Sequence, residues 1–260
     1  MFGNFGKSFS FGERPGIKAT VSRSNLLTVY PSTQLWYDFS STGSTSYSPV
    51  PTTVTNGGSM TQAHDLAGNN RNTNNVSNFK YITNVSGSLG AANMGAGGYF
   101  NTNSTTSWLS NLSGMTVIVA AYQTSSGSTY YLCNTDQGDL AIYYSGGQWQ
   151  VKCSGGNGNS TVNAQNNRWQ LHSFVYDGSA ATNAQKLRYR YNKADQVLTI
   201  TGTIAAKSNA SNDNYVWAAQ DTSSSNAFKG YIGEVLLFNK ALSSGELSGI
   251  ETYLGNKWGI

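Results

Sequence analysis

The sequence predicts an all-β protein, a sandwich or barrel of short strands joined by many turns. Ser, Gly, Asn and Thr supply 116 of the 260 residues, whereas Glu, a strong helix former, occurs four times. Small polar residues favour turns, and the 16 Tyr and 6 Trp favour strands. An aromatic content of 12% with a net charge of +4 argues against a disordered chain.

Candidate strands are short and are separated by Gly, Asn, Ser or Asp-Gly. No period of 20–50 residues repeats among them, which argues against a solenoid or propeller. The predicted strands are 35–39, 79–85, 115–122, 129–134, 139–145, 148–154, 169–176, 186–191, 196–201, 215–220 and 231–238.

The segment 139–154 has the pattern of a β-hairpin. Gly146 and Gly147 form a two-residue turn between two alternating runs. This turn pairs Tyr144 with Trp149, and it pairs residues 142 and 140 with 151 and 153.

A preceding turn at 135–138 adds a third strand to this hairpin and pairs Cys133 with Leu140. The two cysteines then lie two strand spacings apart, about 9.5 Å, which is too far for a disulfide. We therefore expect two buried free thiols, as in a reducing compartment. The predicted core face carries Tyr131, Cys133, Leu140, Ile142, Tyr144, Trp149, Val151 and Cys153, and Tyr130, Leu132, Ala141, Tyr143, Gln150 and Lys152 face outward.

One helix is predicted, at the C-terminal end of the sequence. Ser243 and Glu246 fit a capping box, and Gly255 is expected to end the helix. The residues expected to pack on the sandwich are Leu247, Ile250, Leu254, Trp258 and Ile260.

An extended, basic N-terminal arm is predicted for residues 1–30, ahead of a domain spanning 31–260. The arm holds four basic residues against one acidic residue, whereas the rest of the chain holds twelve against eleven. Because its Phe residues are separated by Gly and Ser, we expect them to dock in a groove, on another subunit or on their own domain. The predicted docking residues are Phe2, Phe5, Lys7, Phe9, Phe11 and Arg14.

Catalytic motifs are lacking, so we expect no enzymatic activity. Glycosidases use two carboxylates about 5–9.5 Å apart, and Glu234 is the one glutamate on a predicted strand, with Lys229 or Lys240 as its expected partner. His64 and His172 have no nucleophile motif beside them. Each is expected to be a solvated or core-rim side chain.

Two kinds of binding residue remain as candidates, and no cofactor is expected. Asp136 and Asp139 lie at one turn and are weak calcium candidates, although Asp commonly caps turns. Aromatic side chains that can stack on sugars are Tyr130, Tyr143, Trp108 and Trp217.

The charge and hydropathy patterns bear on the compartment and the partners. No run approaches the ~20 apolar residues of a membrane span, and the N-terminal segment lacks the apolar region of a signal peptide. The near-neutral body shows no basic face for nucleic acid. Synthesis in a cytoplasm, without membrane or nucleic-acid partners, is therefore expected.

Four motifs, in order, resemble the laminin-G-like, concanavalin A-like domain family. They are Trp36-Tyr37-Asp38-Phe39 with residues 64–70, Gly98-Tyr99-Phe100 with residues 112–119, the strand 169–178, and the closing strand and helix start at 231–243. The resemblance covers roughly residues 33–260. It implies a jelly-roll β-sandwich of two antiparallel sheets, with a short C-terminal helix and the extended arm.

The family contains lectins, glycosidases and virion domains, so the fold alone leaves the function open. With its arm and no signal peptide, the chain looks most like a tailed-phage virion protein. The implied role is a non-enzymatic decoration of the virion surface, anchored by the arm to capsid or tail subunits. Self-association is a further partner that this role allows. The alternatives are a lectin-like module that binds host-surface glycans and a polysaccharide-degrading enzyme that uses Glu234.

Overall fold

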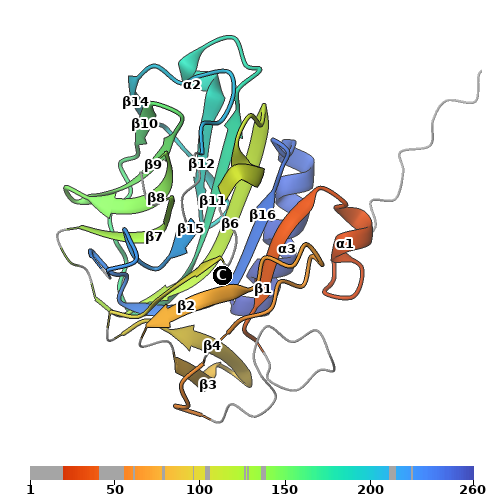
Figure 1. Cartoon of the computed structure of the whole chain (residues 1–260), viewed down its shortest axis with the longest axis vertical. Helices are drawn as coiled ribbons and strands as arrows, with labels where there is room; N and C mark the ends of the chain where they lie inside the picture. The colour runs from red at the N-terminus through yellow and green to blue at the C-terminus, as the bar shows by residue number, and fades with distance from the viewer. Residues whose placement is uncertain are drawn as a thin grey trace, which may run out of the picture.

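The computed structural model describes residues 20–40, 56–60, 62–77, 80–95, 97–102, 106–125, 127, 129–135, 139–210, 215–223 and 225–260. Within them, two antiparallel sheets pack face to face as a jelly-roll β-sandwich (Figure 1). The all-β prediction is confirmed. The arm residues 1–19 lie outside the described part.

Sheet A has the strand order β13-β12-β11-β6-β16-β4-β3, with β1 also pairing with β16. Its longest strands, β6 and β11, are almost entirely buried because both of their faces are covered. The strand bounds are β13 (Ala194–Gln196), β12 (Leu187–Tyr191), β11 (Arg168–Asp177), β6 (Gly114–Gln123), β16 (Gly230–Phe238), β4 (Leu89–Asn93), β3 (Lys80–Ser86) and β1 (Thr33–Asp38).

Sheet B has the order β14-β10-β9-β8-β7-β15-β5-β2. Burial alternates along its middle strands, which is typical of a sheet with one face in the core and one face in solvent. The bounds are β14 (Thr199–Gly202), β10 (Gly156–Asn159), β9 (Gln148–Cys153), β8 (Leu140–Ser145), β7 (Thr129–Thr135), β15 (Tyr215–Trp217), β5 (Tyr99–Thr102) and β2 (Thr73–Ser77).

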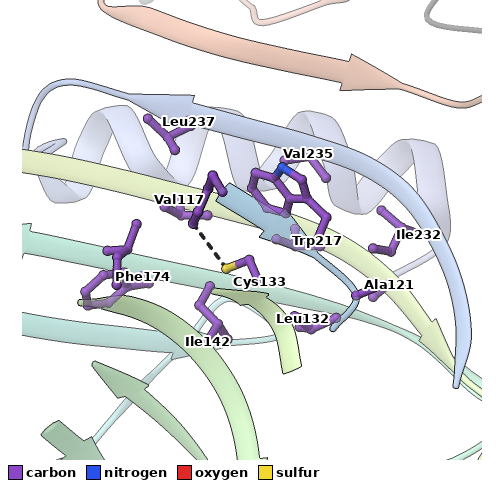
Figure 2. Close-up of a cluster of buried hydrophobic side chains, with 14 of the residues drawn as sticks. Val117, Ala121, Leu132, Cys133, Ile142, Phe174, Trp217, Ile232, Val235 and Leu237 are labelled. Carbon is purple, nitrogen blue, oxygen red and sulfur yellow. Dashed lines mark hydrogen bonds between the residues drawn. The ribbon is translucent and has the colours of Figure 1, made fainter. Parts of the chain in front are cut away.

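The main core lies between the two sheets and is rich in large aromatic side chains. Figure 2 shows Cys133 and Ile142 of sheet B facing Val117 and Val235 of sheet A. Cys133 and Cys153 are both buried and free, as predicted.

A second core lies on the other face of sheet A, beneath the helix α3 (Ser244–Trp258) (Figure 1). The predicted capping box of Ser243 and Glu246 is present. The predicted helix stop is wrong: Gly255 is helical and buried, and Gly259, at φ 73°, is the C-cap. The described residues also contain three short helical turns, α1 (Leu26–Val29), η1 (Thr106–Leu109) and α2 (Asn183–Lys186).

A β-bulge in β7 changes the predicted register. The pairing of β8 with β9 is as expected, but Cys133 pairs with Ile142 rather than Leu140. The irregularity lies between Tyr131 and Cys133, where Leu132 is the extra residue. The prediction that Leu132 faces outward is therefore wrong, because Leu132 and Cys133 both enter the core.

A second bulge lies in β16, between Ile232 and Glu234. Ile232 and Val235 both face the core between the sheets. The extra residue, Gly233, thus turns the Glu234 side chain to the other face of sheet A, under α3.

Candidate functional site

The solvent face of sheet B carries a row of aligned side chains, one from each of four neighbouring strands. Tyr131 of β7 pairs with Tyr143 of β8, which pairs with Gln150 of β9, which pairs with Asn159 of β10. We call these four residues the tyrosine–amide row. Since neighbouring strands are about 4.8 Å apart, the row spans about 14 Å across the sheet.

The two tyrosines of the row stack on each other. The Tyr131 and Tyr143 ring centroids are 5.0 Å apart with an interplanar angle of 13°, and both side chains are partly exposed. Tyr130 and Tyr144 form a similar stack, 4.9 Å apart, on the core face of the same strands. One tyrosine pair therefore belongs to the core and the other is presented to solvent.

Amide side chains continue the surface beyond the tyrosines. The Tyr143 hydroxyl donates a hydrogen bond to Asn157 Oδ1 (2.9 Å). Asn157 Nδ2 in turn donates to Gln150 Oε1 (3.1 Å) and to Asn159 Oδ1 (2.6 Å). These bonds fix the rotamers of the amides, and they leave further amide donors and acceptors at the surface.

The tyrosine–amide row is almost uncharged. In strands β7 to β10, all of whose residues the structure describes, Lys152 is the one charged side chain. It lies on β9 next to Gln150 along the same face and pairs across the sheet with Ala141 and Asn157. An aromatic stack beside uncharged amides is a surface suited to hydroxyl-rich ligands.

A loop borders the Tyr131 end of the row. Within residues 218–228, the Asn226 carbonyl accepts a hydrogen bond from the Tyr131 backbone N–H (3.1 Å). Asp221 Oδ1 organises the loop by accepting from the Ser223 backbone N–H (2.9 Å) and from its hydroxyl (2.7 Å). The backbone of this loop therefore lies beside the Tyr131 end of the row.

The four aromatic candidates for sugar stacking lie in different places. Tyr143 lies on the open face as expected, and Tyr131, which sequence reasoning put in the core, lies beside it. The outward placement of Tyr130 is wrong, because the bulge turns its ring into the core, and Trp217 is also fully buried there. Trp108 is partly buried against the core, with the Arg71 guanidinium 3.9 Å from its ring centroid. Trp217 therefore has no ring face open to a ligand, and Arg71 lies over the ring of Trp108.

The other predicted site residues are placed as follows. Asp136 and the arm residues Phe2, Phe5, Lys7, Phe9, Phe11 and Arg14 lie outside the described residues, and Asp139 is partly buried at the start of β8. Among the described residues, no group of three or more His, Cys, Asp or Glu side chains is arranged to hold a metal ion.

No described helix is long and apolar enough to span a membrane.

A pair of carboxylates exists, but it is enclosed beneath α3. Glu234 Oε2 and Asp38 Oδ1 accept from Lys257 Nζ at 2.6 and 2.8 Å, and Arg23 Nε donates to Asp38 Oδ2 at 2.7 Å. We call these four residues the Lys257 cluster. The prediction that Lys229 or Lys240 pairs with Glu234 is wrong.

Lys240 instead pairs with Glu246 on the surface. The α3 backbone places Lys257 one turn beyond Tyr253, over the Glu234 side chain. Sequence reasoning missed the pairing because these residues are far apart along the chain.

Burial and the Lys257 charge act in opposite directions on the pKa values of the two carboxylates in the Lys257 cluster. Burial raises the pKa of Glu234 to about 7, with the nearby Asp38 charge acting in the same direction. The pKa of Asp38 is lowered: burial opposes this, but Lys257 and the Ser40 contacts outweigh it. Both carboxylate side chains are 0% exposed, so a polysaccharide has no access to them.

His172 lies in the core between the sheets rather than at its rim. Its Nδ1 is 2.8 Å from the Tyr189 hydroxyl, and its ring packs on Trp149. Burial lowers the pKa of His172 to about 3. His64 is partly exposed in the 62–72 loop. The histidine candidates therefore lie apart from each other and from the tyrosine–amide row.

Comparison with known proteins identifies the family. The family model Laminin_G_3, described as the concanavalin A-like lectin/glucanases superfamily, matches residues 90–248. The chain belongs to this family, as the four sequence motifs predicted. No curated protein matches the chain in sequence.

Solved structures share the fold at low sequence identity. The binding domain of Paraclostridial Mosquitocidal Protein 1 is similar with a TM-score of 0.56 and 13% identity, over 77% of this chain and 51% of that chain. Domain 4 of AbnA, a GH43 extracellular arabinanase from Geobacillus stearothermophilus solved in complex with arabinotriose, gives 0.52 and 14%, over 72% and 91%. Trypanosoma rangeli sialidase gives 0.53 and 12%, over 87% and 33%. The chain thus spans about half of the first of these proteins and a third of the sialidase, and the likeness establishes the fold.

Proposed function

We propose that this protein is a glycan-binding module and that the ligand lies on the tyrosine–amide row. The observation that carries the proposal is the solvent-facing stack of Tyr131 and Tyr143. Apolar faces of sugar rings pack on aromatic rings, while the surrounding hydroxyl groups need hydrogen-bond partners. The row provides both aromatic rings and hydrogen-bonding groups on adjacent strands.

The geometry favours a ligand that lies across the strands. The row runs perpendicular to β7–β10, so a chain of sugars meets the tyrosines first and then Gln150 and Asn159. Because β-strands hold these side chains, the surface is preformed and loses little conformational entropy on binding. AbnA domain 4, which shares the fold, was solved with arabinotriose, and this supports an oligosaccharide as the ligand.

Binding without hydrolysis is the activity we propose. The buried carboxylates Asp38 and Glu234 lie beneath α3, on the opposite side of sheet A from sheet B. They are separated from the proposed ligand by the core and by sheet A itself.

A glycan array followed by titration of the best ligand tests this proposal. We expect retention of a defined oligosaccharide, and we expect Tyr131→Ala and Tyr143→Ala to weaken it while Tyr231→Ala, a partly exposed tyrosine on sheet A, leaves it unchanged. Equal binding by all three variants, or no glycan retained by the full chain, would contradict the proposal. Release of sugar fragments that stops in Glu234→Gln would instead support the enzyme alternative.

The role on a virion surface is a separate proposal about where the module is displayed. It is supported by the base of the arm, which is fixed to the domain: Leu26 and Tyr30 are buried, and the Tyr30 hydroxyl donates to the Glu246 carbonyl (3.0 Å). A segment that anchors the domain to another protein must itself be packed firmly against the domain. Deleting residues 1–16 is expected to abolish attachment to capsid or tail subunits and to leave the domain folded. Attachment that persists without the arm would contradict this role.

A further inference from the structure

The Lys257 amine lies between two buried carboxylates. Its Nζ is 2.8 Å from Asp38 Oδ1 and 2.6 Å from Glu234 Oε2. Both carboxylate side chains are 0% exposed and the lysine side chain is 13% exposed. Burying such charges costs free energy. Replacing a buried ion pair with hydrophobic residues of similar volume often leaves the stability unchanged or raises it. Neither the fold nor glycan binding explains this choice of residues.

We propose that Lys257 and Asp38 condense into an intramolecular amide bond, with Glu234 carrying the proton. The Asp38 carbon lies one covalent bond beyond the oxygen that already touches Nζ, so the reacting groups are in contact. Holding the two groups together in this way gives the high effective concentration that an uncatalysed amide condensation lacks.

The step balances without any co-reactant. Lys257 first passes a proton to the Glu234 carboxylate and becomes a neutral amine. Glu234 passes this proton to an Asp38 oxygen, so that the amine attacks a neutral carboxylic acid. The Nζ–Cγ bond forms, the nitrogen gives up a second proton through Glu234, and the protonated Asp38 oxygen leaves as water. The ammonium and carboxylate are thus replaced by one secondary amide and one water molecule.

The surroundings of Glu234 suit a proton carrier. Trp36 Nε1 donates to its Oε1 at 2.8 Å, and the Tyr253 hydroxyl donates to the same oxygen at 3.1 Å. These bonds leave Oε2 directed at Lys257 Nζ. Burial raises the pKa of Glu234 to about 7, so its carboxylate is a stronger base than an exposed glutamate.

The surroundings of Asp38 suit an electrophile. Arg23 Nε donates to Oδ2 at 2.7 Å, and the Ser40 backbone N–H donates to Oδ1 at 3.0 Å. Donors on the oxygens draw charge from the carboxyl carbon and stabilise the negative oxygen that forms when the amine attacks.

The other ion pairs of the described residues lack one part of this arrangement. Lys240 and Glu246 pair at the surface, with side chains 52% and 33% exposed, so water competes for both groups. Arg190 contacts the buried Glu251, but a guanidinium remains protonated and is not a nucleophile. In the described part of the chain, an amine, a buried acceptor carboxyl and a second buried carboxylate meet only at Lys257.

The mass of the full-length chain tests the proposal directly. Under denaturing conditions we expect a mass lower than that of the sequence by one water molecule, and a proteolytic digest should contain a branched peptide that joins Lys257 to Asp38. Lys257→Arg should restore the full mass, and the matched change Lys240→Arg should not. Glu234→Gln keeps the side-chain shape and should slow or prevent the loss of water.

Each result decides the proposal. An unmodified wild-type mass overturns it without reference to any variant, and so does a lost water that maps to another position, such as a succinimide. A bond that forms equally fast in Glu234→Gln overturns the assignment of Glu234 as the proton carrier. Glycan binding is measured separately and does not depend on this bond, so failure of one leaves the other intact.

Discussion

Tyr131 and Tyr143 stack with their rings 13° from parallel on the solvent face of sheet B. Directly behind them, Tyr130 and Tyr144 stack at the same angle inside the core. The strands β7 and β8 thus carry one tyrosine stack on each face. The stack on the core face packs inside the protein, and the stack on the solvent face can meet a ligand.

Removing one ring of the exposed stack is expected to weaken glycan binding without unfolding the protein. Tyr143→Ala should lower the affinity roughly tenfold, which is about 1.4 kcal/mol, because the ring and its hydrogen bond to Asn157 are both lost. Tyr143→Phe should lose much less, since it keeps the stack. Isothermal titration of the same oligosaccharide against the three proteins measures the difference, and an affinity loss as large in Tyr143→Phe would show that stacking is not the main contact.

The buried His172 predicts a loss of stability in acid. The folded state holds this histidine neutral, with a pKa of about 3 against 6.5 for the free side chain. Below pH 6.5 the unfolded chain gains a proton that the folded chain does not take up. The free energy of unfolding should therefore fall as the pH drops from 6.5 toward 3, by about 5 kcal/mol for the whole shift.

Urea unfolding across this pH range measures the slope. His172→Phe should flatten it, because Phe fills the space against Trp149 and does not titrate. A slope that is the same in both proteins would assign the acid sensitivity to the carboxylates instead.

The two thiols are expected to be inert in the folded protein. Burial raises the pKa of Cys133 and Cys153 to about 12, and the thiolate is the reactive form. A thiol reagent at mildly alkaline pH should label neither cysteine in native buffer and both in denaturant. Rapid labelling of the native protein would show that sheet B opens readily around β7 and β9.

The bulge residue Gly233 is expected to tolerate no side chain. A Cβ at this position would lie 2.6 Å from the Trp258 ring, so Gly233→Ala must displace that ring from the core under α3. We expect a loss of about 1–3 kcal/mol in the free energy of unfolding. Gly127→Ala is the matched control, since a Cβ there would meet the Thr129 carbonyl oxygen at an ordinary contact distance of 3.9 Å. Thermal melts of the two variants compare them, and equal stability would indicate that Trp258 shifts at no cost.

Local patterns in the sequence predicted the hairpin at Gly146–Gly147 and the start of α3, because both depend on residues close along the chain. The strands β2, β4, β5, β10 and β13 were not among the predicted ranges, since they are short and rich in Gly, Asn or Ala. Such strands form because neighbours in the sheet supply hydrogen bonds, and propensity does not reveal this.

The candidate site was only partly predictable, and the reason is the extra residue at Leu132. Strict alternation along β7 puts Tyr131 in the core and Tyr130 outside, whereas the bulge reverses them. Tyr143, on a strand without a bulge, was placed correctly. The Lys257 cluster was missed because contacts between Asp38 and Lys257 depend on the complete fold.

The pairing of β1 with β16 also constrains how the chain reaches its native state. Leu35 pairs with Leu237, so β1 cannot form this pairing until the residues of β16 have been synthesised. During synthesis on a ribosome, β1 emerges long before its partner and leaves an apolar edge open to other chains. High sequence separation also slows the search for this pairing. Pairing of β1 with β16 is therefore a late step in the folding of this chain.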